Sequence, residues 1–104
     1  MVRVAAEVAD GLYGHPFTTP RFVREVQLPA LEAGLAASGR KRSEFDLPAM
    51  ILTVTGRDAA ERKVALGAAR RLLAFYGSTP AYYRVLELHG FADLGPRLNA
   101  LSKS

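Results

Sequence analysis

Residues Ala9–Pro20 read Ala-Asp-Gly-Leu-Tyr-Gly-His-Pro-Phe-Thr-Thr-Pro, and this stretch decides the predicted fold. The Asp-Gly pair is typical of a helix end, because glycine tolerates the left-handed conformation that closes helices. Gly11–His15 then predicts a short β-strand, which the following proline ends because it has no N–H to donate to a sheet. Thr19 and Pro20 predict a new helix, with a hydroxyl N-cap and proline at the first helical position.

A second predicted strand, Leu47–Thr55, is a near-continuous apolar run that contains β-branched residues. Such a run suits a strand that is buried on both faces of a parallel sheet. Between the two strands, apolar residues recur at steps of three to four from Phe22 to Leu35 and predict a helix that Gly39 closes. This helix either kinks at Pro29 or restarts there.

The C-terminal half predicts helices only. Asp58 with Glu61 three residues later indicates a capped helix start, and that helix runs to Gly77. Further helices are predicted at Pro80–His89 and, less completely, at Asp93–Ser104.

The fold class that follows is α/β, with the order β-α-β-α after a two-turn helix at Val2–Ala9. Two strands joined by a long helical crossover lie parallel in a βαβ unit. A pair of strands is not a stable parallel sheet, and Leu47–Thr55 would present an open apolar edge, which is a template for association. We therefore expect that the chain is not a stable monomer and that other copies or another chain complete its core.

Composition narrows the classes of function. At 104 residues the chain is at most one domain, and 49% hydrophobic residues are enough for a core. The chain has no cysteine, so it has no disulfides and no thiolate metal ligands, and this favours the cytoplasm. No stretch approaches the ~18 apolar residues of a membrane helix. The two histidines are far apart in the sequence, so we expect no metal site.

The net charge is +4, and the cations are dense only at Arg40-Lys41-Arg42. The run lies between Gly39 and Ser43 and is interpreted as a solvated loop, so replacing all three residues by Gln should leave folding intact. A phosphate-binding patch on a weak nucleic-acid binder is the alternative. A single-strand binder requires aromatic residues interleaved with its cations, and this run has none. We therefore expect no nucleic-acid partner.

Four parts of the sequence resemble the luciferase-like flavin and deazaflavin oxidoreductases, and a deazaflavin-dependent branch in particular. These parts are Val8–Leu12, His15–Pro20, Gly39-Arg40 with Phe45, and Phe75–Tyr82. The resemblance spans nearly the whole chain but only the C-terminal third or so of such an enzyme. The family fold is a TIM-type (β/α)8 barrel. The resemblance therefore implies that residues 1–104 are a single partial domain that holds the last two strands of the barrel with their helices.

The resemblance also implies an oxidoreductase or monooxygenase that transfers a hydride with a deazaflavin coenzyme or FMN. Much of that cofactor pocket, including its phosphate loop, would come from the first six strands of the barrel. We therefore expect this chain alone to be inactive and to bind neither cofactor with high affinity. Its expected partner is another copy or a chain that completes the barrel. The alternative function is a small, non-enzymatic α/β module that forms homo-oligomers.

The candidate site residues bind a cofactor or substrate in this interpretation, and no catalytic residue can be named. His15, at the end of its strand, could bond a flavin-type ring or shuttle a proton, or could simply bond nearby backbone. Thr18 could contact a ligand from the same rim. Tyr76 and Tyr82 flank Ser78 at a predicted helix start, where they could line a pocket or be ordinary half-buried aromatics.

Overall fold

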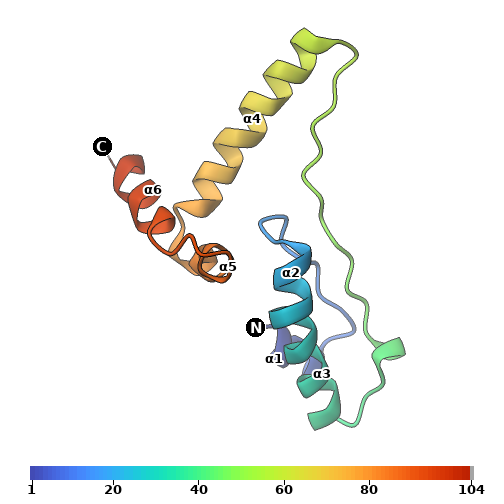
Figure 1. Ribbon diagram of the computed structural model, residues 1–104. Helices are drawn as coiled ribbons and strands as arrows, with labels where there is room; N and C mark the ends of the chain where they lie inside the picture. The colour runs from blue at the N-terminus through green and yellow to red at the C-terminus, as the bar shows by residue number, and fades with distance from the viewer. Residues whose placement is uncertain (104) are drawn as a thin grey trace. The chain divides into compact units, whose positions relative to one another are not determined.

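The computed structural model describes residues 1–103 and divides the chain into two compact units, Met1–Met50 and Ile51–Ser104. The structure is 63% helical. Its helices, labelled in Figure 1, are α1 (Val2–Val8), α2 (Pro20–Phe22), η1 (Val23–Gln27), α3 (Leu28–Ala37), η2 (Arg42–Glu44), α4 (Ala59–Gly77), η3 (Pro80–Tyr82), α5 (Tyr83–Leu88) and α6 (Leu94–Ser102). The prediction of a single partial domain over residues 1–104 stays a prediction.

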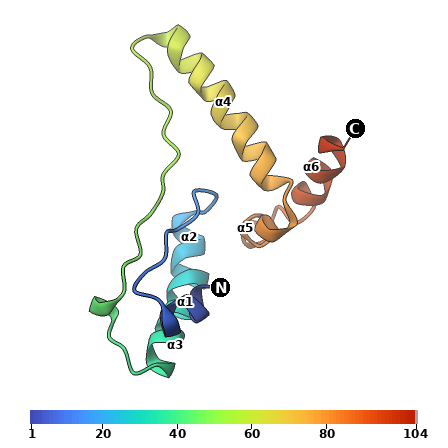
Figure 2. The same cartoon turned by 180° about the vertical axis from the view of Figure 1, so that it is seen from behind.

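Within the first unit, α1 packs along α3, and both views show the two helices side by side (Figures 1 and 2). Gly34 allows this close approach, because a Cβ at this position would overlap the Arg3 carbonyl oxygen and lie 2.7 Å from the Ala6 Cβ. The residues that form the core of this unit are Ala6, Leu31, Leu35 and Phe45.

The helix that starts at Pro20 continues to Ala37 through a widened turn. Its start is as predicted, since the Thr19 hydroxyl accepts a hydrogen bond from the Phe22 N–H at 3.1 Å. The N–H of Leu28 donates to the Val23 carbonyl five residues back, which is the hydrogen bond of a π-helical turn. Pro29 has no N–H to donate, and the wide turn directly before it takes the place of the predicted kink or restart.

The predicted β-α-β-α fragment of a TIM-type barrel is wrong for this structure. The described residues contain no β-strand, and the two predicted strands meet only at isolated parallel bridges, Gly11 with Asp46 and Gly14 with Ala49. Beyond the second bridge, residues 50–56 have no regular secondary structure. The segments thus lie in parallel register, as expected, but they do not form strands.

Pro48 explains why the pairing is interrupted between the two bridges. The Asp46 N–H donates to the Asp10 carbonyl, and the Leu12 N–H donates to the Asp46 carbonyl, each at 2.9 Å. The next donor in this parallel register would be the N–H of residue 48, which proline lacks. Only the Gly14 N–H to Pro48 carbonyl bond remains there, at 2.9 Å. The ladder is therefore interrupted after its first rung.

Arg40 corrects the interpretation of its basic run as a solvated loop. Its guanidinium donates hydrogen bonds to the carbonyls of Ala9 at 2.6 Å, Ala6 at 3.2 Å and Glu44 at 3.0 Å. Its side chain is only 21% exposed and lies 3.8 Å from the Asp10 carboxylate. Arg40 thus caps the C-terminal end of α1, where orphan carbonyls and the helix dipole favour a cation.

In the second unit, α4 begins as predicted. The Asp58 carboxylate accepts a hydrogen bond from the Glu61 N–H at 2.8 Å, so Asp58 is the N-cap. The helix ends at Gly77, and η3, α5 and α6 follow. The predicted helix Pro80–His89 is present as a 3₁₀ turn that leads into α5, and α6 lies within the predicted Asp93–Ser104.

Candidate functional site

Three of the predicted site residues lie at the junction between α4 and η3: Tyr76, Ser78 and Tyr82. Ser78 is the C-cap of α4 and is only 7% exposed. Its hydroxyl donates to the Phe75 carbonyl at 2.7 Å, and its N–H donates to the Ala74 carbonyl at 2.9 Å. The polar hydrogens of Ser78 are therefore used to end the helix.

The carbonyl of Ser78 joins three helices of this unit. It accepts a hydrogen bond from the Asn99 side-chain amide of α6 at 2.8 Å and one from the Tyr83 hydroxyl of α5 at 3.4 Å. The ring of Tyr83 also lies against Gly95, where a Cβ would come within 2.5 Å of it. Sequence reasoning missed Asn99, although it is a polar residue between the apolar positions Leu98 and Leu101.

Tyr76 and Tyr82 contact each other through their rings. The ring centroids are 5.9 Å apart at an interplanar angle of 73°, which is the edge-to-face arrangement that aromatic pairs favour. Phe75 extends this cluster, with its centroid 5.8 Å from that of Tyr76. Both tyrosines are half-buried, and the cluster forms an aromatic surface at the C-terminal end of α4.

An apolar groove of about 310 Å³ lies between the end of α4 and α6. The residues that line it are Ala74, Phe75, Ser78, Leu98, Leu101 and Ser102. Of the predicted site residues it includes Ser78, whereas Tyr76 and Tyr82 lie outside its lining. The groove is large enough for a small ligand, but its walls are almost entirely apolar.

His15 and Thr18 belong to the first unit and lie three residues apart in the turn before α2. The His15 Nδ1 accepts a hydrogen bond from the Phe17 N–H at 3.1 Å, so this histidine bonds nearby backbone. The hydroxyl oxygen of Thr18 is buried and has no hydrogen-bond partner. A buried hydroxyl without a partner is uncommon and costly, which marks Thr18 as a candidate ligand contact.

A depression of about 290 Å³ in the first unit lies beside the interrupted ladder and does not include His15 or Thr18. Its lining residues are Asp10, Gly11, Leu12, Tyr13, Asp46 and Pro48. Asp10 and Asp46 line this space from paired segments, and the Asp10 carboxylate lies 3.8 Å from the Arg40 guanidinium. Among the described residues, no group of three or more His, Asp or Glu side chains is placed to hold a metal ion.

A flavin or deazaflavin requires apolar walls for its ring system and several donors for its polar edge and phosphate. The groove between α4 and α6 offers walls, but the Ser78 donors next to it are already used. The buried Thr18 hydroxyl is available for a polar edge. Taken separately, the second unit offers apolar walls and the first unit offers one buried hydroxyl, and neither unit forms a whole cofactor site.

A sequence model of the luciferase-like monooxygenase family matches residues 1–102. The chain therefore belongs to the luciferase-like monooxygenase family, a family of oxidoreductases, and the predicted resemblance is confirmed. No solved structure matches the chain. Within residues 1–103, no helix is both long and apolar enough to cross a bilayer.

Relatives from three organisms illustrate the match. Uncharacterised proteins of Mycobacterium bovis and Mycobacterium tuberculosis are each 52% identical to the chain over 103 residues, which are 99% of this chain and 30% of the relative. The 5,10-methylenetetrahydromethanopterin reductase of Archaeoglobus fulgidus is 36% identical over 95 residues, which are 89% of this chain and 26% of the reductase. The chain thus spans less than a third of the length of these relatives.

Proposed function

We propose that the chain forms part of a luciferase-like oxidoreductase that transfers a hydride with a deazaflavin coenzyme or FMN. The family match over residues 1–102 carries this proposal, and the reductase among the relatives supports it. The coenzyme supplies the hydride chemistry when it is bound. The chain supplies residues that border the pocket, and it is inactive without the polypeptide that completes the site.

The roles of the chain's own residues follow from their surroundings. Thr18 bonds a polar edge of the ligand, because its hydroxyl is buried and has no other partner. In the second unit, taken by itself, Tyr76 and Tyr82 offer aromatic surface that suits an apolar part of a ligand. Ser78 is a positioning residue, since its hydroxyl and N–H hold the end of α4 beside these rings.

A chimera tests this proposal. The segment of the Mycobacterium tuberculosis relative that matches this chain is replaced by the chain itself, which is 52% identical to it. Fluorescence titration with FMN and with a deazaflavin coenzyme is then performed on the chimera, the unmodified relative and the isolated chain. We expect the relative and the chimera to bind one of the two cofactors in the micromolar range or tighter, and the isolated chain to bind neither.

Two results would overturn the proposal. One is a relative that binds neither cofactor, and the other is a cooperatively folded chimera that has lost the binding of its parent. Tight binding by the isolated chain would instead contradict the expectation that it holds only part of the site. Within the chimera, Thr18→Val should weaken binding about 5- to 10-fold, the loss of one hydrogen bond, whereas Thr18→Ser should retain it.

A further inference from the structure

An uncovered apolar stripe runs along α4. Val64, Ala68, Leu72 and Phe75 follow one another at steps of four, four and three residues, which places them on one face of the helix. Val64 is 73% exposed, Leu72 37% and Phe75 66%. A stripe of this kind faces a core in globular proteins, so the exposure of these side chains indicates that their cover is not part of the second unit.

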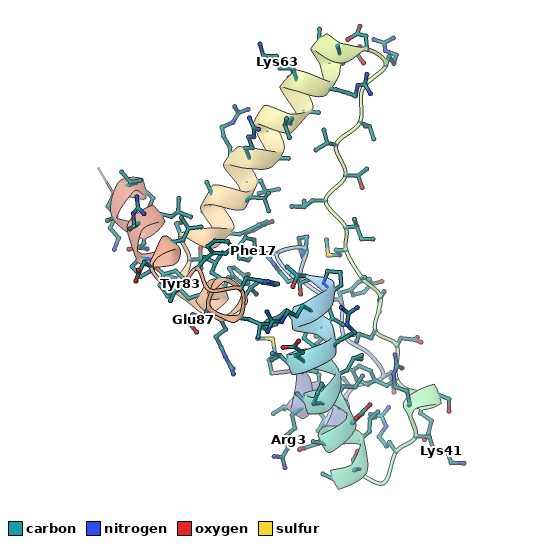
Figure 3. The ribbon with its side chains drawn as sticks, viewed as in Figure 1. Arg3, Phe17, Lys41, Lys63, Tyr83 and Glu87 are labelled. Carbon is teal, nitrogen blue, oxygen red and sulfur yellow. The ribbon has the colours of Figure 1, made fainter. Side chains whose placement is uncertain are left out.

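The opposite face of α4 carries two cations. Lys63 and Arg70 are seven residues apart and therefore share this face, and both side chains are exposed. Figure 3 shows Lys63 extending away from the α4 ribbon. Leu66 and Leu73 lie on this face as well, so it is mixed in character. The stripe is the unbroken apolar row of α4 and is therefore the side that requires a partner surface.

The second unit does not cover the stripe by itself. Its other helices contact α4 at the C-terminal end, where the groove lined by Phe75, Leu98 and Leu101 continues the stripe. Val85 is the large hydrophobic residue that the described part of this unit buries. A helix as long as α4, with 19 residues, gains its stability in proteins chiefly by packing its apolar face.

The lengths of the relatives indicate which polypeptide covers the stripe. The mycobacterial relatives are more than three times as long as this chain, so most of their sequence has no counterpart here. A second copy of the chain would bury one self-complementary patch. The exposed apolar side chains instead occur on several elements in both units, among them Val8 on α1, Ile51, and Leu101 on α6. This distribution favours one large polypeptide as the cover.

We propose that the stripe Val64, Ala68, Leu72 and Phe75, continued by the groove between α4 and α6, docks onto the portion of a luciferase-like polypeptide that this chain does not match. This inference rests on the proposed function, because it names the partner that completes the site. Lys63 and Arg70, on the opposite face of α4, stay in solvent in the assembled protein.

The absence of cysteine from the chain allows a direct test. Leu72→Cys places a single thiol on the stripe, and Arg70→Cys places a matched thiol on the opposite face. The rate of maleimide labelling is measured for each variant in the isolated chain and in the chimera with the Mycobacterium tuberculosis relative. The chimera without an engineered cysteine supplies the background. We expect the Leu72→Cys thiol to react at least tenfold more slowly in the chimera than in the isolated chain, and the Arg70→Cys thiol to react equally in both.

Several outcomes would overturn the docking proposal. Equal labelling of the Leu72→Cys thiol in both proteins would show that the stripe stays in water. Slow labelling in the isolated chain would show that the chain or a second copy covers the stripe. Binding of the isolated chain to anionic phospholipid vesicles that protects this thiol, without protection in the chimera, would show that the stripe is a lipid-binding surface.

A chimera that does not fold calls for a second form of the experiment. The unmatched portion of the relative is then expressed as a separate tagged chain together with each cysteine variant, and labelling is measured on the copurified complex. Failure to copurify would overturn the proposal. Labelling is read without any cofactor, so a protected Leu72→Cys thiol in a chimera that binds neither FMN nor deazaflavin would refute the proposed function and leave the docking surface intact.

Discussion

The side-chain amide nitrogen of Asn99 lies 2.8 Å from the main-chain oxygen of Ser78 and donates a hydrogen bond to it. This bond connects α6 to the C-cap of α4 across 21 positions of sequence. Since Ser78 is buried, its carbonyl would otherwise have to rely on the longer contact with the Tyr83 hydroxyl at 3.4 Å. The geometry of the groove between α4 and α6 therefore depends on Asn99.

Replacement of Asn99 by Ala should destabilise the second unit by about 1–2 kcal/mol, because a buried carbonyl loses its best donor. Urea unfolding followed by far-UV circular dichroism measures the change. Tyr83→Phe is the matched control, since it removes only the 3.4 Å contact, and it should cost less than about 0.5 kcal/mol. Equal effects of the two substitutions would contradict this ranking of the two donors.

Gly34→Ala should destabilise the first unit by about 1–3 kcal/mol, because the added methyl group meets the Arg3 carbonyl and forces α1 away from α3. Gly67→Ala is the control within α4. The nearest atom to a Cβ at Gly67 is an Arg71 guanidinium nitrogen at 3.7 Å, so this change should stabilise the chain by up to about 1 kcal/mol through helix propensity. Thermal unfolding of both variants would show opposite shifts, and a stabilised Gly34→Ala variant would disprove the close approach.

Arg40→Gln should lower the free energy of unfolding by about 1–3 kcal/mol, since the carbonyls at the end of α1 lose a charged donor. Lys41→Gln, at the neighbouring position, should be near neutral because its exposed side chain has no such role. Chemical denaturation of the two single variants separates the cap from the solvated part of the loop. If both variants unfold like the parent chain, the expectation of a wholly solvated run holds after all.

The signals that sequence reasoning interpreted correctly are local. The Thr19 and Asp58 caps depend on N–H groups three residues away, and the Gly39 helix end depends on a positive φ of 68° at that residue. Pro48 was also visible in the sequence, but its effect depends on a carbonyl of Leu12 that only the fold places opposite. The Thr19 and Asp58 helix starts and the Gly39 helix end were therefore predictable. The expected left-handed helix end at Gly11 was wrong, because α1 ends at Val8 with an extended C-cap, Ala9. The parallel direction of the two segments was predictable, and the failure to form strands was not.

In the candidate site, too, local features were predictable and contacts between distant residues were not. Ser78 and the two tyrosines around it were predicted from one contiguous segment, and the structure brings Tyr76 and Tyr82 into ring contact. Asn99 and Arg40 were missed because their acceptors lie 21 and 31 residues away, at the carbonyls of Ser78 and Ala9. No periodic pattern indicates which distant carbonyl a polar side chain will reach.

The start of α4 should weaken in acid because of Glu61. Its carboxylate accepts hydrogen bonds from the Arg57 guanidinium, with Nε to Oε1 at 3.0 Å, and from the Arg57 N–H at 2.8 Å. The Arg57 side chain, and then this N–H, lower the pKa of Glu61 below its ordinary value of 4.5. A pKa lowered by folding means that the stabilisation is complete above the pKa in the unfolded chain and is lost as the pH falls through the folded value.

Hydrogen exchange at the first turn of α4 should therefore accelerate as the pH falls through the lowered pKa of Glu61, beyond the intrinsic pH dependence of exchange. Glu61→Gln should remove this excess, and 1 M salt should reduce it because the pair is exposed. A carboxyl titration of Glu61 by NMR measures the pKa directly. A midpoint at or above 4.5 would show that Arg57 does not stabilise the carboxylate in solution.

The last prediction concerns the interrupted pairing in the first unit. Pro48→Ala restores an N–H at the position that faces the Leu12 carbonyl in the parallel register. The new bond should contribute about 0.5–1.5 kcal/mol, and the loss of proline rigidity in the unfolded chain should cost about 0.4–1 kcal/mol. The two terms nearly cancel, so the free energy of unfolding is a poor readout and the amide itself must be observed.

In the Pro48→Ala variant, we expect the new amide to exchange at least tenfold more slowly than an unprotected amide, and the Gly14 amide to gain protection with it. Pro20→Ala is the control, because Pro20 is the first residue of α2 and the first N–H groups of a helix have no acceptor within the helix. If the amides introduced by the two substitutions exchange equally fast, the ladder ends for a reason other than the missing donor. The exposed segment after Met50 would then explain the end of the ladder, because the described bridges do not extend to it and its backbone groups bond to water instead.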